Sequence, residues 1–333
     1  MKNITKLGLS ALAGTLAATS VNAGEMSLSG SMEATYTTGG GYSTVGNPLG
    51  MDKELSVTGS GELDNGWAIS YKQTITDAMA FNDSEMVVDT GSFGTIALTS
   101  TGSPISAIDD VTPTAFEEAN ALVGSMDDVN GGDGSYGIRW TLSDILGSGM
   151  KADVMYFPKQ GSGDATADNG TSGDSAGDDA WEYTLTGSVP MLPGLSFGAG
   201  YVDLTKDLDQ VSTSDDIGQD EGTAYLKYAY GPVTVGYQVG AVSGKAAGSA
   251  DYKNTYVGIS YQVTDDFSVS YNEITSNKMP DQGASVEQDF DSISLSYSMG
   301  GMTLSLADSD CGNCSYTSAR STTATSISMA VAF

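Results

Sequence analysis

The sequence has no histidine, only two cysteines, no apolar run of transmembrane-helix length after residue 23, and few basic residues. Histidine is the most common general base, so its absence removes the familiar Ser–His arrangement and predicts that the chain is not an enzyme. Thirteen Lys and Arg stand against 42 Asp and Glu, a formal net charge of −29. Because phosphate recognition needs clustered Lys and Arg, we expect no nucleic-acid partner.

The first 23 residues predict a cleaved signal peptide. Lys2 and Lys6 form a basic start, residues 7–18 are a short apolar run, and residues 21–23 (VNA) have the small-x-small pattern of a cleavage site. The run is too short to span a bilayer permanently. We therefore expect an exported protein with a single mature unit, residues 24–333.

Apolar and polar residues alternate with a period of two throughout the mature chain. In residues 67–72, for example, Trp, Ile and Tyr alternate with Ala, Ser and Lys. A strand has this pattern when its two faces meet different media. Sixteen such segments are predicted: 25–37, 52–63, 67–77, 84–90, 94–101, 135–143, 149–157, 180–190, 194–204, 222–230, 233–242, 253–263, 267–275, 288–298, 302–308 and 321–333.

Short and long connections alternate between these segments. Turns such as 64–66 (DNG) and 231–232 (GP) contrast with longer polar connections near 38–51, 101–134, 158–179, 205–221, 243–252, 276–287 and 309–320. This parity is typical of a transmembrane barrel, and a soluble β-sandwich would not show it. Aromatic residues near the short turns favour an interfacial girdle, although aromatics are also good strand formers: Trp67, Phe93, Tyr230, Phe267 and Phe333. The predicted fold is all-β, a sixteen-stranded antiparallel transmembrane β-barrel.

Two segments carry a resemblance to a known family. Residues 327–333 (ISMAVAF) form an alternating apolar strand that ends on Phe, and residues 89–98 (DTGSFGTIAL) precede a long acidic loop. With the signal peptide and the sixteen-segment layout, the chain resembles the general diffusion porins of Gram-negative bacteria, most closely those of the alphaproteobacterial type. The resemblance implies a homotrimer in the lipid bilayer of the outer membrane, with a third loop folded into each lumen as a constriction. It also implies a water-filled channel for passive diffusion of ions and small hydrophilic solutes.

Residues 101–134, which we call loop 3, are the predicted constriction. A long connection without a strand pattern tends to be functional, although an acidic surface loop is the simpler alternative. Residues 114–123 predict a short helix with Thr114 as N-cap. The loop has no basic residue and seven acidic ones: Asp109, Asp110, Glu117, Glu118, Asp127, Asp128 and Asp133.

The pore wall is predicted to supply basic side chains opposite loop 3. Strand parity points Lys72, Arg139, Lys151 and Lys227 into the lumen. Each would cost about 2–4 kcal/mol on the lipid face at the midplane. We expect a transverse field between the acidic groups of loop 3 and Lys72 and Arg139, with Lys151 close to the exit. The excess of carboxylates predicts a mild cation preference, although acidic loops can also serve solubility alone.

The remaining candidates are the cysteines and calcium. Cys311 and Cys314 fall in the last long loop, where an oxidising compartment favours a disulfide staple over a redox or zinc site. No cofactor is required, but crowded loop carboxylates suit Ca²⁺. Residues 128–133 are similar to a calcium loop without its distal Glu. The alternative function is a secreted acidic calcium-binding β surface protein of the S-layer or adhesin type.

Overall fold

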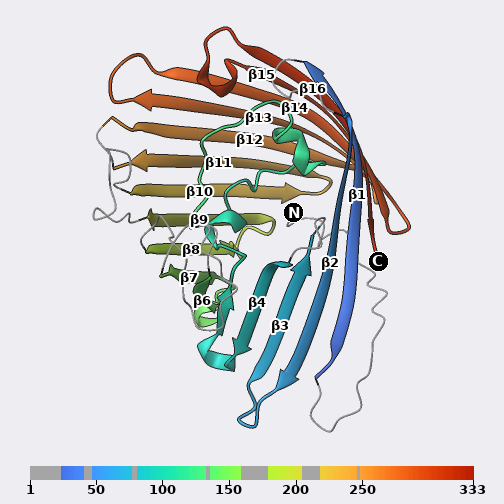
Figure 1. The fold of residues 1–333 in the computed structure, drawn as a ribbon, viewed down its shortest axis with the longest axis vertical. Helices are drawn as coiled ribbons and strands as arrows, with labels where there is room; N and C mark the ends of the chain where they lie inside the picture. The colour runs from blue at the N-terminus through green and yellow to red at the C-terminus, as the bar shows by residue number, and fades with distance from the viewer. Residues whose placement is uncertain are drawn as a thin grey trace.

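The structure is a computed structural model that describes residues 24–40, 47–76, 81–132, 136–158, 179–204, 218–245 and 248–333. The predicted signal peptide, residues 1–23, lies outside the described residues. Within the described ranges, sixteen antiparallel strands close into a barrel in which β1 pairs with β16 (Figure 1). The strands are β1 (Met26–Gly40), β2 (Leu49–Glu62), β3 (Ala68–Ile75), β4 (Phe81–Asp89), β5 (Thr95–Thr99), β6 (Gly137–Leu142), β7 (Lys151–Phe157), β8 (Ala180–Ser188), β9 (Leu195–Leu204), β10 (Gln219–Tyr230), β11 (Val233–Gly244), β12 (Ala250–Thr264), β13 (Phe267–Pro280), β14 (Val286–Met299), β15 (Met302–Gly312) and β16 (Ser321–Ala332). The predicted fold is confirmed.

The apolar face of the sheet lies on the outside of the barrel. Ile293 is 62% exposed, whereas Gln238 and Gln288, on the inner face, are fully buried. Val235, Ile259, Tyr271 and Ile293 are paired in register across β11 to β14 and form one row of an outer apolar belt. A soluble β protein would bury this face, so the arrangement is that of a barrel surrounded by lipid.

The outer belt ends in a row of carboxylates. Glu273, Asp291 and Asp310 are paired in register on β13, β14 and β15, at the outward positions that follow Tyr271, Ile293 and Asp308 toward the long loops. Carboxylates are expensive in hydrocarbon. The row therefore marks the edge of the belt on the side of the long loops.

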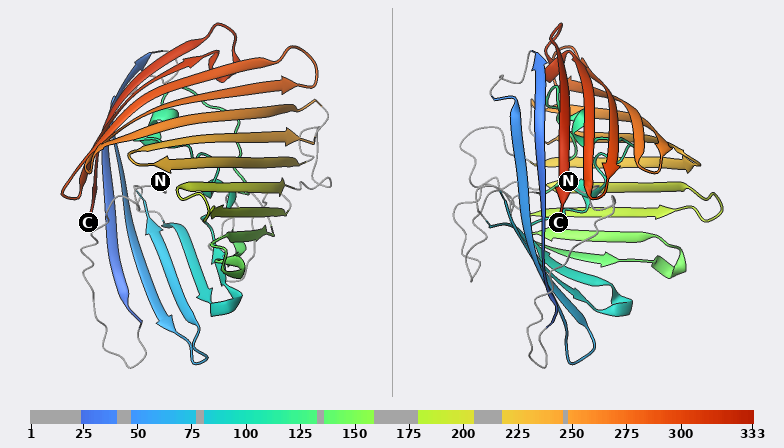
Figure 2. Two further views of the ribbon diagram at one scale, coloured as in Figure 1. Left: turned by 180° about the vertical axis from the view of Figure 1, so that it is seen from behind. Right: turned by 90° about the vertical axis from the view of Figure 1, so that its right-hand side faces the viewer.

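The short turns form the opposite rim. Glycine at positive φ allows several of them to close tightly, as at Gly231 (φ 56°) and Gly300 (φ 58°). The predicted girdle residues Trp67, Phe93, Tyr230 and Phe333 are exposed in this region, which agrees with an aromatic belt at one interface. The wall is lowest at β5 to β7 and tallest at β1 and β12 (Figure 2).

Two predictions about elements are wrong. The helix expected over residues 114–123 is only a single 3-10 turn, Glu117–Asn120. Thr114 Oγ1 donates to the carbonyl of Phe116 (2.9 Å) and caps nothing. The fifteenth segment, expected to be short, extends as β15 to Gly312. Among the described residues, no helical segment is long and apolar enough to span a bilayer.

Candidate pore constriction

Loop 3 leaves β5, crosses the inner face of the barrel wall and returns to β6 (Figure 1). On the outward path, the amide of Val111 donates to Gln238 Oε1 of β11 (2.9 Å). Farther along, the amide of Phe116 donates to Ser294 Oγ of β14 (3.1 Å), and Ser309 Oγ of β15 donates to the carbonyl of Ala119 (2.5 Å). The loop therefore lies against the inner faces of β11, β14 and β15.

Apolar side chains of loop 3 face this wall. Ile105, Ile108 and Val129 pack in a buried cluster with side chains of β7, β8, β9 and β11. Val123, near the far end of the loop, packs in a second cluster with Tyr256, Ile274 and Phe290. Burial of apolar area on one side of the loop leaves its polar side for the lumen.

Two buried carboxylates hold the returning limb of loop 3. The amides of Asn130 and Gly131 donate to Glu221 Oε2 of β10 (2.7 and 2.9 Å), and the amide of Gly132 donates to Glu182 Oε1 of β8 (2.7 Å). Gly131 has a φ of 77°, a conformation in which consecutive amides form an anion-binding concavity.

Glu182 also ties the two ends of the loop together, since its Oε2 accepts from Ser103 Oγ (2.7 Å) on the outgoing limb. The amides of residues 129–132, within the stretch that is similar to a calcium loop, thus bind the protein's own carboxylates. The described residues contain no group of three acidic, His or Cys side chains arranged to hold a metal ion. Asp133 lies outside them.

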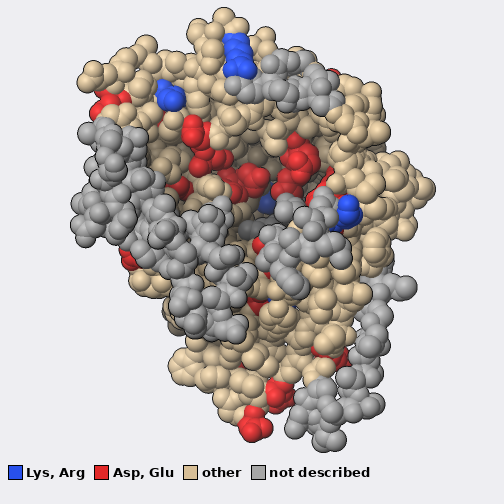
Figure 3. All heavy atoms as spheres, viewed as in Figure 1, with Lys and Arg blue, Asp and Glu red and all other residues tan. Residues whose placement is uncertain are grey.

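Acidic side chains of loop 3 gather at a hollow of about 260 Å³. Its lining includes Asp110, Glu117, Glu118 and Asp128 from the loop and Tyr256 from β12. Figure 3 shows acidic side chains around the hollow at the centre of the barrel. Burial raises the pKa of Asp110 to about 6, because it removes water from the carboxylate, and the negative charge of Glu117 adds to this effect.

The Asp128 side chain and the Asp127 backbone are bonded to the wall. The Asp128 carboxylate accepts hydrogen bonds from the Tyr256 hydroxyl and from Asn254 Nδ2 (2.9 Å). The carbonyl of Asp127 accepts from the same amide (2.9 Å). At Asp109 it is likewise the carbonyl that meets the wall, accepting from Gln238 Nε2 (2.5 Å). Because the Asp128 carboxylate is held by the wall, Asp110, Glu117 and Glu118 are the lining carboxylates that are best placed to meet a passing solute.

The wall across the lumen from loop 3 is also acidic. Glu33 of β1 and Asp52 of β2 are paired in register and share the inner face. The pKa of Glu118 is raised first by burial and then by the negative charges of Glu33, Glu117 and Asp52. The carboxylates of loop 3 thus face carboxylates of β1 and β2. Glu33 and Asp52 are not among the pore residues predicted from the sequence.

The four predicted basic residues lie on the inner face, but two of them are neutralised locally. Arg139 Nη2 forms an ion pair with Glu85 of β4 (3.1 Å), and Arg139 Nη1 donates to the carbonyl of Gly102 (2.5 Å). Lys151 pairs with Asp153 on its own strand (2.9 Å). Lys72 is paired across the sheet with Glu85, and Lys227 occupies an inward position on β10. The expected field from loop carboxylates to Arg139 is therefore replaced by a contact with a loop carbonyl.

The two cysteines form a disulfide, Cys311–Cys314. Cys311 belongs to β15 and Cys314 begins the turn that follows, so the bond lies at the edge of the predicted loop. Both side chains are buried. They share a cluster with Val123 of loop 3.

A closed barrel with an apolar exterior, a polar interior and a loop folded inside it defines the class of membrane-spanning β-barrel channels. The chain belongs to the Gram-negative porin family, whose model matches residues 8–310. It is an outer-membrane protein, and family and fold together point to a channel and not to an enzyme. The alphaproteobacterial type stays a prediction.

Solved porins share the fold at low sequence identity. OmpT of Vibrio cholerae is similar with a TM-score of 0.70 and 12% identity over 96% of this chain and 100% of that chain. Its trimer form has a TM-score of 0.67 and 11% identity over 93% and 100%. The anion-selective porin from Comamonas acidovorans has a TM-score of 0.65 and 14% identity over 92% and 99%. A comparison with curated proteins finds no match.

Proposed function

We propose that the protein is a water-filled, cation-preferring channel for passive diffusion of ions and small hydrophilic solutes, with loop 3 as its constriction. The observation that carries the proposal is the presence of carboxylates on both sides of the passage, from loop 3 and from β1–β2. Facing carboxylates stabilise a passing cation and repel an anion.

The local ion pairs support the same preference. Arg139 and Lys151 each form an ion pair with a carboxylate, so their positive charges contribute little to the electric field in the passage. The fold by itself leaves selectivity open, because a porin described as anion-selective shares it. Selectivity therefore depends on which side chains line the narrow part.

Reversal potentials in planar bilayers test the proposal. We expect the wild-type protein in a KCl gradient to give the sign of a cation-preferring channel. Replacing three loop carboxylates together, Asp110→Asn, Glu117→Gln and Glu118→Gln, should move the potential toward zero. A matched control removes three charges from the outer face, Glu273→Gln, Asp291→Asn and Asp310→Asn, and should leave the potential nearly unchanged. Anion selectivity of the wild type, or equal effects of the two triple variants, would contradict the proposal.

Assembly and calcium belong to the proposal as further expectations. A homotrimer is supported by the trimer form of the similar OmpT structure and would appear as triplet conductance steps. Calcium at the acidic loops stays a prediction, which titration of the purified protein with Ca²⁺ would test. The alternative of a secreted, soluble calcium-binding protein is not favoured, because the apolar strand face points outward.

A further inference from the structure

We infer that the disulfide hairpin, residues 311–320, is an outer clamp that holds the far end of loop 3 and so fixes the width of the constriction. This inference rests on the proposed function of loop 3. The far end of the loop, residues 122–128, lies along the chain between the turn that includes Ala119 and the Glu221 anchor at Asn130. Its position depends on contacts with β12 to β16.

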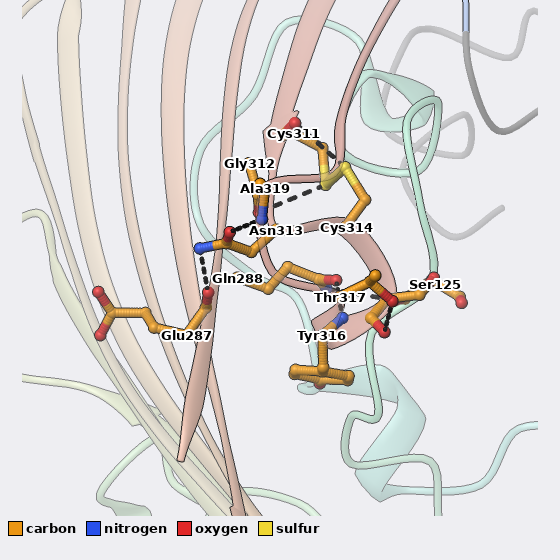
Figure 4. The surroundings of a disulfide bond; sticks show 11 residues. Ser125, Glu287, Gln288, Cys311, Gly312, Asn313, Cys314, Tyr316, Thr317 and Ala319 are labelled. Atoms are coloured by element: carbon orange, nitrogen blue, oxygen red, sulfur yellow. Dashed lines mark hydrogen bonds between the residues drawn. A yellow bond between two sulfur atoms is a disulfide. The ribbon is translucent and has the colours of Figure 1, made fainter. Parts of the chain in front are cut away.

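The hairpin has a backbone conformation that needs support. Asn313, Ser315, Tyr316 and Ala319 all have φ between 51° and 63°. Such left-handed conformations cost non-glycine residues roughly 1–2 kcal/mol each. The disulfide closes the chain at the start of the hairpin, and the Asn313 side chain bridges the Glu287 carbonyl (2.9 Å) and the Ala319 amide (3.0 Å) (Figure 4).

This conformation delivers Tyr316 to loop 3. The Tyr316 hydroxyl accepts a hydrogen bond from the amide of Asp127 (3.1 Å) and is bonded to Ser276 Oγ of β13 (2.7 Å). The Tyr316 amide donates to Gln288 Oε1 (3.2 Å), and the Nε2 of the same side chain donates to the carbonyl of Ser125 (3.2 Å). Tyr316 therefore takes part in holding the far end of loop 3 at two backbone points, the Asp127 amide and the Ser125 carbonyl, beside the contact of Asn254 with the Asp127 carbonyl.

Sulfur itself packs against the loop. Val123 shares a buried cluster with Phe290 and both cysteines. A Cβ added at Gly124 would lie 3.5 Å from Cys311 Sγ, so the loop backbone passes directly over the disulfide. Because the cysteines are only 3% and 0% exposed, the clamp is a permanent staple and not a bond open to exchange from solvent.

The clamp acts on the pore through the loop. Glu117 and Glu118 lie between the outgoing anchors and the clamped end, in the turn that includes Ala119. Release of residues 122–128 leaves Glu117 and Glu118 held only by the contacts of Phe116 and Ala119 with β14 and β15, so the two carboxylates move more widely in the passage. Weaker anchoring of residues 122–128 thus increases both the width of the constriction and the fluctuation of that width.

Single-channel recording of the full-length protein tests the clamp. Cys311→Ser with Cys314→Ser should raise the variance of the open-channel current by about twofold or more. The same variant in liposomes should admit neutral sugars larger than those the wild type admits. Tyr316→Phe keeps the disulfide but loses the hydroxyl that accepts from Asp127, and should change both readouts in the same direction. Heat-modifiable gel migration reports that the barrels are intact.

A rescue variant separates clamping from general stability. Gly124→Cys with Cys314→Ser offers Cys311 a new partner on loop 3, within reach of a disulfide. We expect quiet conductance to return, and a thiol reductant to abolish it again. A wild type without channel steps overturns the proposed function and the inference together. A conducting wild type whose Cys311→Ser/Cys314→Ser and Tyr316→Phe variants are equally quiet and equally size-selective overturns the inference alone.

Discussion

Asp110 illustrates how the lumen changes the chemistry of one carboxylate. Its side chain reaches the water of the passage, yet the surrounding protein and Glu117 raise its pKa to about 6. We expect it to be largely ionised at pH 7 and largely protonated at pH 5. The cation preference should therefore decrease as the pH is lowered from 7 to 5, and reversal potentials measured at each pH would report this decrease.

Asp110→Asn is the variant that checks this assignment, because it removes the titrating group without changing its size. The variant should show a smaller change in reversal potential between pH 7 and pH 5 than the wild type. Its channels should still open normally. The raised pKa has a second consequence. The folded state holds this proton more tightly than the unfolded chain, whose ordinary value is 3.8, so Asp110 favours folding at low pH. That contribution is lost as pH rises from about 4 to about 6. A pH dependence identical in the variant and the wild type would contradict the assignment.

Arg139 shows what strand parity can and cannot predict. Period two gives the direction of the side chain, because successive residues of a strand point to opposite faces. The same period does not predict which residue the side chain will contact. Glu85 lies on β4, separated from β6 by one strand, and the pairing depends on how the two strands are aligned. Glu33 and Asp52 were missed for the same reason, since their proximity to Glu118 exists only after loop 3 has folded inward.

At the level of elements, strands were predictable and the loop was not. The alternation of β11 predicted residues 233–242, and the strand extends only to Gly244. The extent of β15 was underestimated because its outward positions 308 and 310 are Asp, beyond the edge of the apolar belt, where the alternation of apolar and polar residues stops. Strand pairing continues past the belt, so hydropathy underestimates strand length there.

The path of loop 3 depends on long-range hydrogen bonds. Its composition favoured a helix, but the amides of Ala115 and Phe116 donate to Ser270 and Ser294 of the wall (2.8 and 3.1 Å). These donors are thereby taken from any local helix. Serines on strands more than 150 residues away along the chain carry no signal in the loop sequence itself.

Glu182 and Glu221 are expected to hold the base of loop 3. Glu182→Gln replaces one of two carboxylate oxygens with an N–H donor that faces the amide of Gly132 or the hydroxyl of Ser103. The lost charge-assisted hydrogen bonds should cost about 1.5–3 kcal/mol of local anchoring. We expect noisier open-channel currents, and a similar change for Glu221→Gln. Glu62→Gln on the exposed rim is the control and should leave the open-channel current noise unchanged. Quiet channels from both inner variants would rule out this anchoring role.

The whole molecule separates its charges by face. Net charge is −29, yet the outer belt formed by rows such as Val235, Ile259, Tyr271 and Ile293 is apolar. Carboxylates occupy the lumen and the edge of the belt, where water or lipid headgroups can solvate them. The same sequence would fail as a soluble protein, because its polar face is the one enclosed.

Neighbouring residues of β12 test which face meets lipid. Ile259 points outward and is 44% exposed, whereas Ser260 points inward. An arginine near the bilayer midplane on the lipid face costs about 2–4 kcal/mol. Ile259→Arg should therefore lower the free energy of unfolding, measured by urea titration in lipid vesicles, by about that amount. Ser260→Arg, one residue along the same strand, should leave stability nearly unchanged because lumen water solvates the new charge. It should instead shift the reversal potential toward anions. A stable Ile259→Arg beside an unfolded Ser260→Arg would mean that the two faces are reversed, since the same added charge then finds water outside the barrel and none within it.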